Sequence, residues 1–124
     1  MKIYVLEELD VYNLSMELAE DIWNIAVNWN FLAQDTVGKQ IIRSSDSIGA
    51  NIAEGYGRYF YKENRQFCFY ARGSILETKT WLKKSENRKL ITIEQYSILF
   101  SKLEAIHLKL NAYLKFIGKK PPIS

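Results

Sequence analysis

The stretch of sequence that decides the fold is residues 40–58, QIIRSSDSIGANIAEGYGR, which combines a helical period with many small and polar residues. Three isoleucines recur at helical spacing on one face: Ile41, Ile48 and Ile52. Beside them runs a row of small residues four positions apart: Ser45, Gly49 and Ala53. Because small side chains let another backbone approach closely, the stretch predicts a helix that ends near residue 56 and packs tightly against a neighbour.

A second row on the same helix is polar: Arg43, Ser47 and Asn51, with Glu54 within one turn. Gly49 in mid-helix costs about 1 kcal/mol relative to alanine. Gly55 and Gly57 are expected to end the helix in the left-handed conformation. A polar row beside an apolar one needs partners, so the stretch predicts close packing or a buried polar network.

Length and composition favour a single domain spanning residues 1–124 with one hydrophobic core. Cys68 is the only cysteine, which excludes an internal disulfide and fits a reducing compartment. No stretch reaches the roughly 20 apolar residues of a membrane span, and no charged segment precedes an apolar run. We therefore expect a cytoplasmic protein with no membrane partner.

Apolar residues spaced three or four apart predict further helices on both sides of this stretch. In the first helix these positions are Val11, Leu14, Leu18, Ile22, Ile25 and Trp29. The four expected helices cover residues 10–30, 36–56, 62–85 and 92–117. Joined by short connections, they predict an all-α, antiparallel up-down four-helix bundle.

Local signals mark the ends of the expected helices. Asp35 and Thr36 offer a cap for the second helix, and Thr92 followed by Gln95 is a capping box for the fourth. Gly118, two lysines and the two prolines of the chain, Pro121 and Pro122, are expected to end the fourth helix.

Charge is unevenly distributed along the chain, although its net value is only +3. Residues 1–30 contain one lysine and six acidic residues, whereas residues 31–124 contain sixteen basic and eight acidic residues. This pattern is typical of ordinary solvated faces, but it also fits internal compensation or a subunit interface with complementary potentials.

Two runs of sequence, IRSSDSIGANIAEGYGR (42–58) and FCFYARGSILETKTWL (67–82), resemble the four-helix-bundle proteins encoded in intervening sequences of bacterial 23S ribosomal RNA genes. The resemblance extends over residues 10–116, and its most specific parts are SIxANIAEG and ARGSxxE. It implies a ring-like homopentamer. The family also looks related to the accessory variability protein of diversity-generating retroelements, which binds nucleic acid and associates with a reverse transcriptase.

The family pattern falls on polar and small residues of the two middle helices: Gln40, Arg43, Ser47, Asn51, Glu54, Gly55, Arg58, Arg72, Gly73, Ser74 and Glu77. We interpret them as a structural polar network in which Arg43 or Arg72 pairs with Glu54 or Glu77. If that pair is buried, Arg72→Ala or Glu77→Ala should cost about 2–5 kcal/mol. A subunit interface and a ligand or nucleic-acid site remain alternatives.

The chain lacks the residues that most catalytic and metal sites require. His107 is the only histidine, so a nucleophilic triad or a zinc site of the usual kinds is not expected. Glu104 and His107 have the Glu-x-x-His spacing of di-iron bundles, but such sites need two such pairs and two further glutamates. We expect no metal, no cofactor and no enzymatic activity.

Two clusters of basic residues are candidates for nucleic-acid binding. The first, Arg58, Lys62 and Arg65, lies amid Tyr56, Tyr59, Phe60 and Tyr61. The second consists of Lys79, Lys83, Lys84, Arg88 and Lys89. Basic residues with aromatic rings can bind phosphates and stack on unpaired bases. Aromatic residues at a helix start are, however, more often packing or interface residues, and lysines at the end of a helix complement its dipole.

These observations predict a non-catalytic four-helix bundle that forms a homo-oligomer, a pentamer by the resemblance, and binds RNA or DNA. The alternative is an oligomeric protein–protein adaptor or scaffold that binds no nucleic acid.

Overall fold

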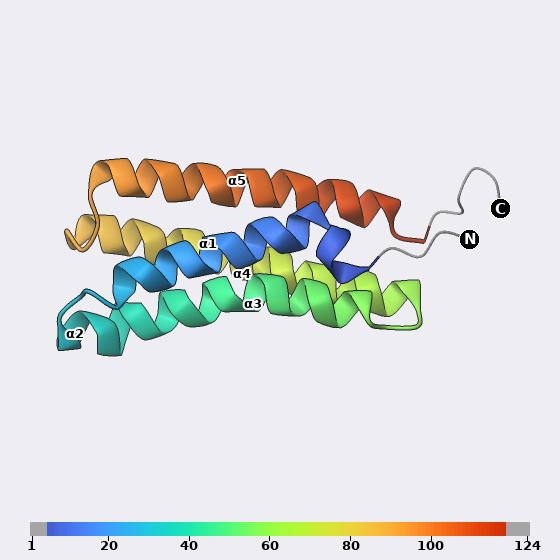
Figure 1. The fold of residues 1–124 in the computed structure, drawn as a ribbon, viewed down its shortest axis with the longest axis horizontal. Coiled ribbons are helices and arrows are strands. Elements are labelled where there is room, and N and C mark those ends of the chain that lie inside the picture. The colour runs from blue at the N-terminus through green and yellow to red at the C-terminus, as the bar shows by residue number, and fades with distance from the viewer. Residues whose placement is uncertain (1–4, 119–124) are drawn as a thin grey trace.

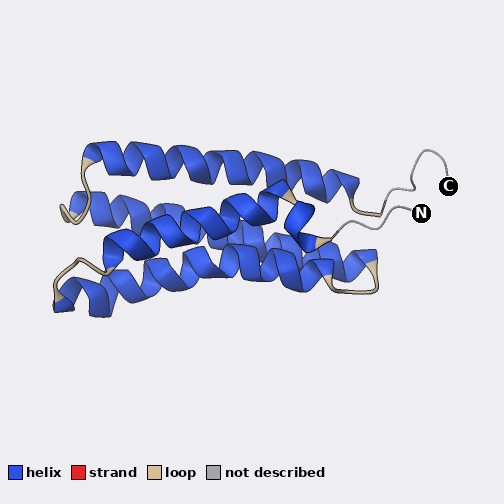
Figure 2. Cartoon of the chain, viewed as in Figure 1, coloured by secondary structure: helices blue, strands red, loops and turns tan. Residues whose placement is uncertain are grey.

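The computed structural model describes residues 5–118, which form a bundle of four long helices with no strand among the described residues (Figures 1 and 2). These helices are α1 (Asp10–Ala26), α3 (Lys39–Tyr56), α4 (Tyr61–Asn87) and α5 (Ile93–Phe116), and a 3-10 turn (Leu6–Glu8) precedes α1. The predicted all-α bundle is confirmed.

The connection after α1 differs from the prediction. α1 ends at Ala26 rather than near residue 30, and the next helix begins at Phe31. The Asn30 side chain accepts a hydrogen bond from the Ala33 amide at 3.0 Å and caps this helix. The expected start at residue 36 is therefore wrong.

The helix runs from α2 (Phe31–Ala33) through a π-helical turn (Gln34–Gly38) directly into α3. Thr36, an expected cap, instead donates through its hydroxyl to the carbonyl one turn earlier, at 2.7 Å. Asp35, the other expected cap, pairs with Lys39 at 2.6 Å. Both residues thus lie inside the helix that they were expected to begin.

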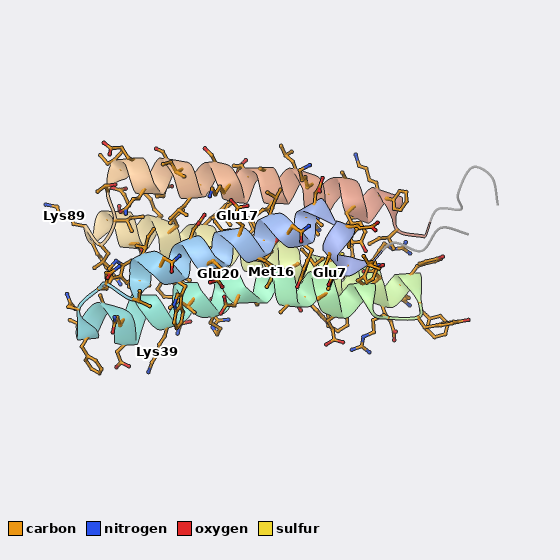
Figure 3. The ribbon with its side chains drawn as sticks, viewed as in Figure 1. Glu7, Met16, Glu17, Glu20, Lys39 and Lys89 are labelled. Carbon is orange, nitrogen blue, oxygen red and sulfur yellow. The ribbon has the colours of Figure 1, made fainter. Side chains whose placement is uncertain are left out.

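α3 ends at Tyr56, as expected, but the glycines at its end do not have the expected conformation. Gly55 lies within α3 and Gly57 follows it with φ −78°, so neither adopts the left-handed conformation. Positive φ occurs instead at Lys89 (60°), which projects from the α4–α5 turn (Figure 3), and at Gly118 (85°). Pro121 and Pro122 lie outside the described residues.

The start of α5 is as predicted. The Thr92 hydroxyl accepts from the Gln95 amide at 3.0 Å, and the Gln95 side chain accepts from the Thr92 amide at 2.9 Å. This reciprocal pair is the predicted capping box, which satisfies two of the free amides at the start of a helix.

The helices are arranged as a square in which α1 and α4 each pack against α3 and α5, and thus occupy one diagonal (Figure 1). α1 approaches α3 closely at Gly49, where an added Cβ would lie 3.1 Å from Met16 Sδ and 3.6 Å from Ser15 Cβ. The close approach predicted from the small-residue row is confirmed at this position.

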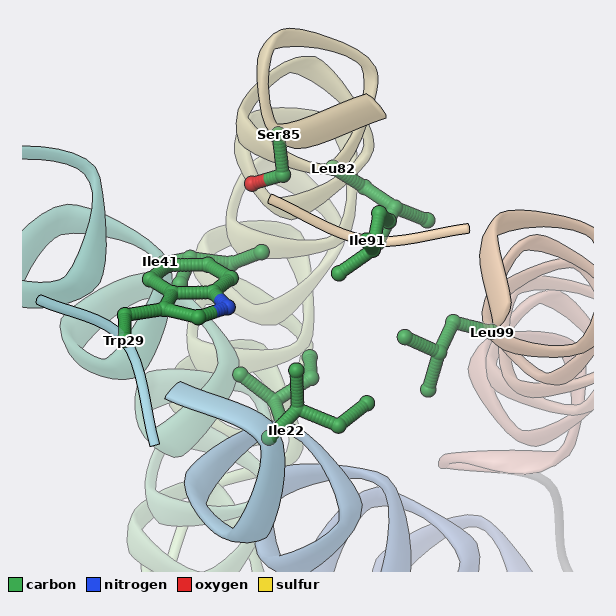
Figure 4. A pocket seen from close by; sticks show the side chains of 8 residues that line it. Ile22, Trp29, Ile41, Leu82, Ser85, Ile91 and Leu99 are labelled. Atoms are coloured by element: carbon green, nitrogen blue, oxygen red, sulfur yellow. The ribbon is translucent and has the colours of Figure 1, made fainter. Parts of the chain in front are cut away.

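The core between the helices is apolar and tightly filled. Its largest fully buried side chains include Leu18, Ile41, Ile48, Ile52, Ile75, Leu82, Leu103, Ile106 and Leu110. A void of about 10 Å³ lies among Ile22, Trp29, Leu82 and Leu99 near one end of the bundle (Figure 4). Because one water molecule needs at least about 10–15 Å³, this void has no room for a ligand larger than water.

Candidate functional site

The residues of the family pattern that bond between α3 and α4 lie along the outer seam of these two helices: Arg43, Ser47, Ser74 and Glu77. Arg43 forms an ion pair with Glu77, and its guanidinium also donates to Gln40 Oε1 at 3.1 Å. The side chains of Arg43 and Glu77 are 57% and 38% exposed. Glu77 also accepts from the Trp81 indole at 3.1 Å. The expected pair therefore forms, but the expectation that it is buried is wrong.

Deeper in this α3–α4 seam, hydroxyl groups join the two helices. The Ser47 and Ser74 hydroxyl oxygens are 2.8 Å apart, and the Thr78 hydroxyl lies 2.9 Å from Ser44 Oγ. Asn51 donates to the Ser47 carbonyl at 2.8 Å. No buried side-chain nitrogen or oxygen in residues 5–118 lacks a partner, so this part of the seam is fully satisfied.

The other charged residues of the pattern have different partners from those expected. Glu54 pairs with Arg58 at 3.4 Å, and the Arg58 guanidinium lies 4.7 Å from the centre of the Phe67 ring. Arg72 points to α5, where it donates to Asn111 Oδ1 at 3.4 Å. Arg72 consequently pairs with neither Glu54 nor Glu77.

Four basic residues of α4, spaced seven, seven and four positions apart, form what we call the basic seam against α5: Arg65, Arg72, Lys79 and Lys83. Arg65 donates to the Ile117 carbonyl at 3.1 Å, and Lys79 pairs with Glu104. The hydrogen bond from Lys79 lowers the pKa of the Glu104 carboxyl.

Lys83 in the basic seam pairs with Glu86 at 3.0 Å and lies 5.3 Å from the Tyr96 ring centre. Three of the predicted nucleic-acid-binding residues, Arg65, Lys79 and Lys83, are thus engaged within the bundle. Sequence reasoning missed this seam because helical spacing identifies a shared face but not the helix that it faces.

The remaining residues of the first basic cluster lie at the α3–α4 connection, with three exposed aromatic residues. We call this set the aromatic corner: Arg58, Tyr59, Phe60, Tyr61 and Lys62. Tyr59 is 89% exposed and meets Phe60 edge to face, with ring centres 5.0 Å apart. Aromatic rings open to solvent beside two exposed cations give stacking surfaces with adjacent phosphate-binding groups.

Lys84, Arg88 and Lys89, the rest of the second cluster, lie at the opposite end of α4 (Figure 1). Lys84 is 5.9 Å from the centre of the Trp81 ring. At about 1.5 Å per residue, the 27 residues of α4 separate the two ends by about 40 Å. The aromatic corner and this remainder of the second cluster therefore do not form one patch on a single chain.

Residues suited to metal or nucleophilic chemistry are not gathered in one place. Within residues 5–118 no group of three or more His, Cys, Asp or Glu could hold a metal ion. Burial raises the pKa of the Cys68 thiol to about 11, so the thiolate needed for reactivity is scarce at neutral pH. None of the described helices is long and apolar enough to cross a bilayer.

Known proteins share this architecture. A family model described as 23S rRNA-intervening sequence protein matches residues 7–112, which contain both seams and the aromatic corner. The chain is also similar to a solved structure of a protein of unknown function from the S23 ribosomal protein family of Bacteroides thetaiotaomicron, at 30% identity and a TM-score of 0.76. That match covers 85% of this chain and 98% of the other. No curated protein matches.

Proposed function

The chain belongs to the family of 23S rRNA-intervening sequence proteins, and from this premise we propose that it is a non-catalytic, cytoplasmic homo-oligomer that binds RNA or DNA. The proposed oligomer is the pentamer that the resemblance to the family implied. The observation that carries the nucleic-acid proposal is the aromatic corner, where three exposed rings lie between two exposed cations.

Exposed rings at a connection between helices contribute little packing within a single chain. Tyr59, Phe60 and Tyr61 are all exposed by more than half, and stacking on such rings contributes about 1–3 kcal/mol per base. Arg58, which also pairs with Glu54, and Lys62 supply positive charge on either side of these rings. An oligomer presents several copies of this corner, which raises the apparent affinity for a long strand without any new contact.

The direct test is binding of labelled single-stranded and duplex RNA and DNA at about 50 and 200 mM salt, with light scattering on the same sample. We expect binding that weakens steeply with salt, because several phosphates are neutralised. Tyr59→Ala and Lys62→Gln should each weaken it. Lys109→Gln, which removes a surface lysine of α5 paired with Asp10, is the matched control and should bind normally. Absence of binding at 50 mM salt would refute the proposal.

The second candidate is an oligomeric adaptor without nucleic-acid binding. It is favoured by exposed apolar side chains on the solvent side of α5: Ile98, Leu108 and Phe116. If the protein forms an oligomer that binds none of the nucleic acids tested, the adaptor function is favoured.

A further inference from the structure

Two opposite sides of the bundle expose apolar side chains, accompanied by negative charges on one side and by positive charges on the other. The acidic face consists of Met16, Glu17, Glu20 and Trp23 of α1 with Asp46 of α3. The basic face consists of Phe69, Arg72, Leu76 and Lys79 of α4 with Leu108 of α5. Each face combines exposed apolar side chains with charges of one sign.

The acidic face has few cations nearby to balance its charge. α1 contains four acidic residues and no lysine or arginine in Asp10–Ala26. Glu17 lies 3.5 Å from Lys102 at the α5 edge of this face. Toward α3, partial burial and the nearby charge of Glu20 raise the pKa of Asp46. Figure 3 shows Met16, Glu17 and Glu20 along α1.

Exposed apolar groups mark the centre of the acidic face. Trp23 is 49% exposed and borders a shallow groove that Ile42 and Gly38 of the neighbouring helix line. Met16 is also exposed and sits above Gly49. Tryptophan is enriched among the residues that dominate interface energies.

The basic face has a matching pattern along α4. Phe69, Arg72, Leu76 and Lys79 alternate apolar and cationic side chains at spacings of three and four, so they form one stripe. Arg72 lies 5.0 Å from the Phe69 ring centre. Leu108 of α5 is 70% exposed beside them. Arg72 bonds to the neutral Asn111 amide and Lys79 to the Glu104 carboxylate, so the charge of Arg72 is not neutralised and gives this face its positive charge.

The two faces of one chain cannot meet. α1 and α4 occupy one diagonal of the square, so the faces point away from each other. A contact between them must join two copies, and it joins different surfaces of each. Such head-to-tail contacts generate closed rings or open filaments, unlike the two-fold dimer made when one face pairs with itself.

We propose that the acidic face of one copy docks on the basic face of the next, with Trp23 and Met16 packed against Phe69, Leu76 and Leu108. This inference rests on the homo-oligomer of the proposed function and assigns its interface. It leaves both ends of each bundle uncovered, so the aromatic corner of every copy stays accessible to nucleic acid.

Two variants, each damaged on one face only, test the proposal. Glu20→Lys with Trp23→Ser removes the acidic face, and Phe69→Ser with Leu76→Ser removes the basic face. These side chains are exposed, so both variants should keep the wild-type helical circular dichroism. Each alone should have the mass of one chain in light scattering. Ile93→Ser, which removes an exposed apolar side chain outside both faces, is the matched control and should assemble as wild type.

Mixing the two variants is the decisive step. Only one intact junction is then available, between the acidic face of one variant and the basic face of the other, so the mixture should contain two-chain particles and nothing larger. A mixture that stays monomeric, variants that assemble normally, or a monomeric wild-type protein would each overturn the inference.

The nucleic-acid part of the proposed function is tested separately on the same samples. Monomeric variants should still bind a short labelled single strand, because the aromatic corner is unchanged in them. Variants that fail to assemble but still bind the strand would support the proposed interface and leave the nucleic-acid proposal standing. Variants or wild-type protein that assemble without binding would contradict only the nucleic-acid proposal.

Discussion

Helix α4 joins its two neighbours in different ways. Toward α3 it presents short hydroxyl groups, Ser74 and Thr78, which allow close approach and form hydrogen bonds of 2.8–2.9 Å. Toward α5 it presents the basic seam, whose long side chains bridge to carbonyl, amide and carboxylate oxygens. The comparison teaches that short polar groups fix the spacing of two helices, whereas long cations adapt to it.

The closest approach in the α3–α4 seam offers the largest expected effect. A Cβ at Gly55 would lie 2.7 Å from Asn64 Oδ1, 2.9 Å from Phe67 Cβ and 3.0 Å from the Asn64 carbonyl oxygen. Gly55→Ala should therefore lower the free energy of unfolding by about 1–3 kcal/mol through overpacking, as measured by urea denaturation.

Gly73→Ala is the matched control, because no atom lies within 4 Å of an added Cβ there. It should raise stability by up to about 1 kcal/mol through helix propensity. Equal effects of the two substitutions would show that α3 and α4 are not tightly packed at Gly55.

The buried hydroxyl pair gives the next effect. Thr78→Val keeps the shape of the side chain but removes the partner of Ser44 Oγ, so we expect a loss of about 1–2 kcal/mol. Thr80→Val on the exposed side of the same helix, where the hydroxyl bonds only to the Leu76 carbonyl, is the control. Thermal melts in which the two variants behave alike would contradict a specifying role for the hydroxyl pair.

The exposed charges of the two seams should matter less. Glu77→Ala breaks the pair with Arg43, and Arg72→Ala removes the contact with Asn111. Because both sites reach solvent, each change should lower stability by no more than about 1 kcal/mol, below the range expected for a buried pair. A loss above about 2 kcal/mol in urea denaturation would mean that water does not screen these contacts.

The smallest effect is a dependence on pH in the α4–α5 seam. Lys79 lowers the pKa of Glu104 in the folded chain, so the pair stabilises the fold above the usual glutamate pKa of about 4.3. That contribution is lost as the pH falls through the lowered value. Urea midpoints measured between pH 3 and 7 should fall less on acidification in Lys79→Gln than in the wild-type protein. Identical profiles would show that the Lys79–Glu104 pair does not contribute to stability.

Much of the architecture could be predicted because helical periodicity depends on burial. Ile41, Ile48 and Ile52 are all fully buried or nearly so, and the close approach at Gly49 and the Thr92–Gln95 capping box follow from local chemistry. The family resemblance from the two motif runs is likewise confirmed by the match over residues 7–112.

The second helix was misplaced for a physical reason. Phe31 and Leu32 are exposed, so the start of this helix has no apolar periodicity, and Asn30 weakened the pattern although it is a favourable cap. The Arg43–Glu77 pair was among those expected, but the partner of Arg72 was not, because Arg72 faces α5 rather than α3. Spacing along a helix does not tell which neighbour a side chain reaches.

The π-helical turn between α2 and α3 has a consequence for how the molecule can evolve. Such a turn holds one residue more than a regular helical turn. In a regular helix the loss of one residue would rotate the preceding segment by about 100°, but here it would only return the wide turn to a regular one. Loss of one codon within Gln34–Gly38 should therefore leave Leu32 in the groove that it shares with Arg88 and Leu90, and a lineage can shorten the chain here without disturbing the core.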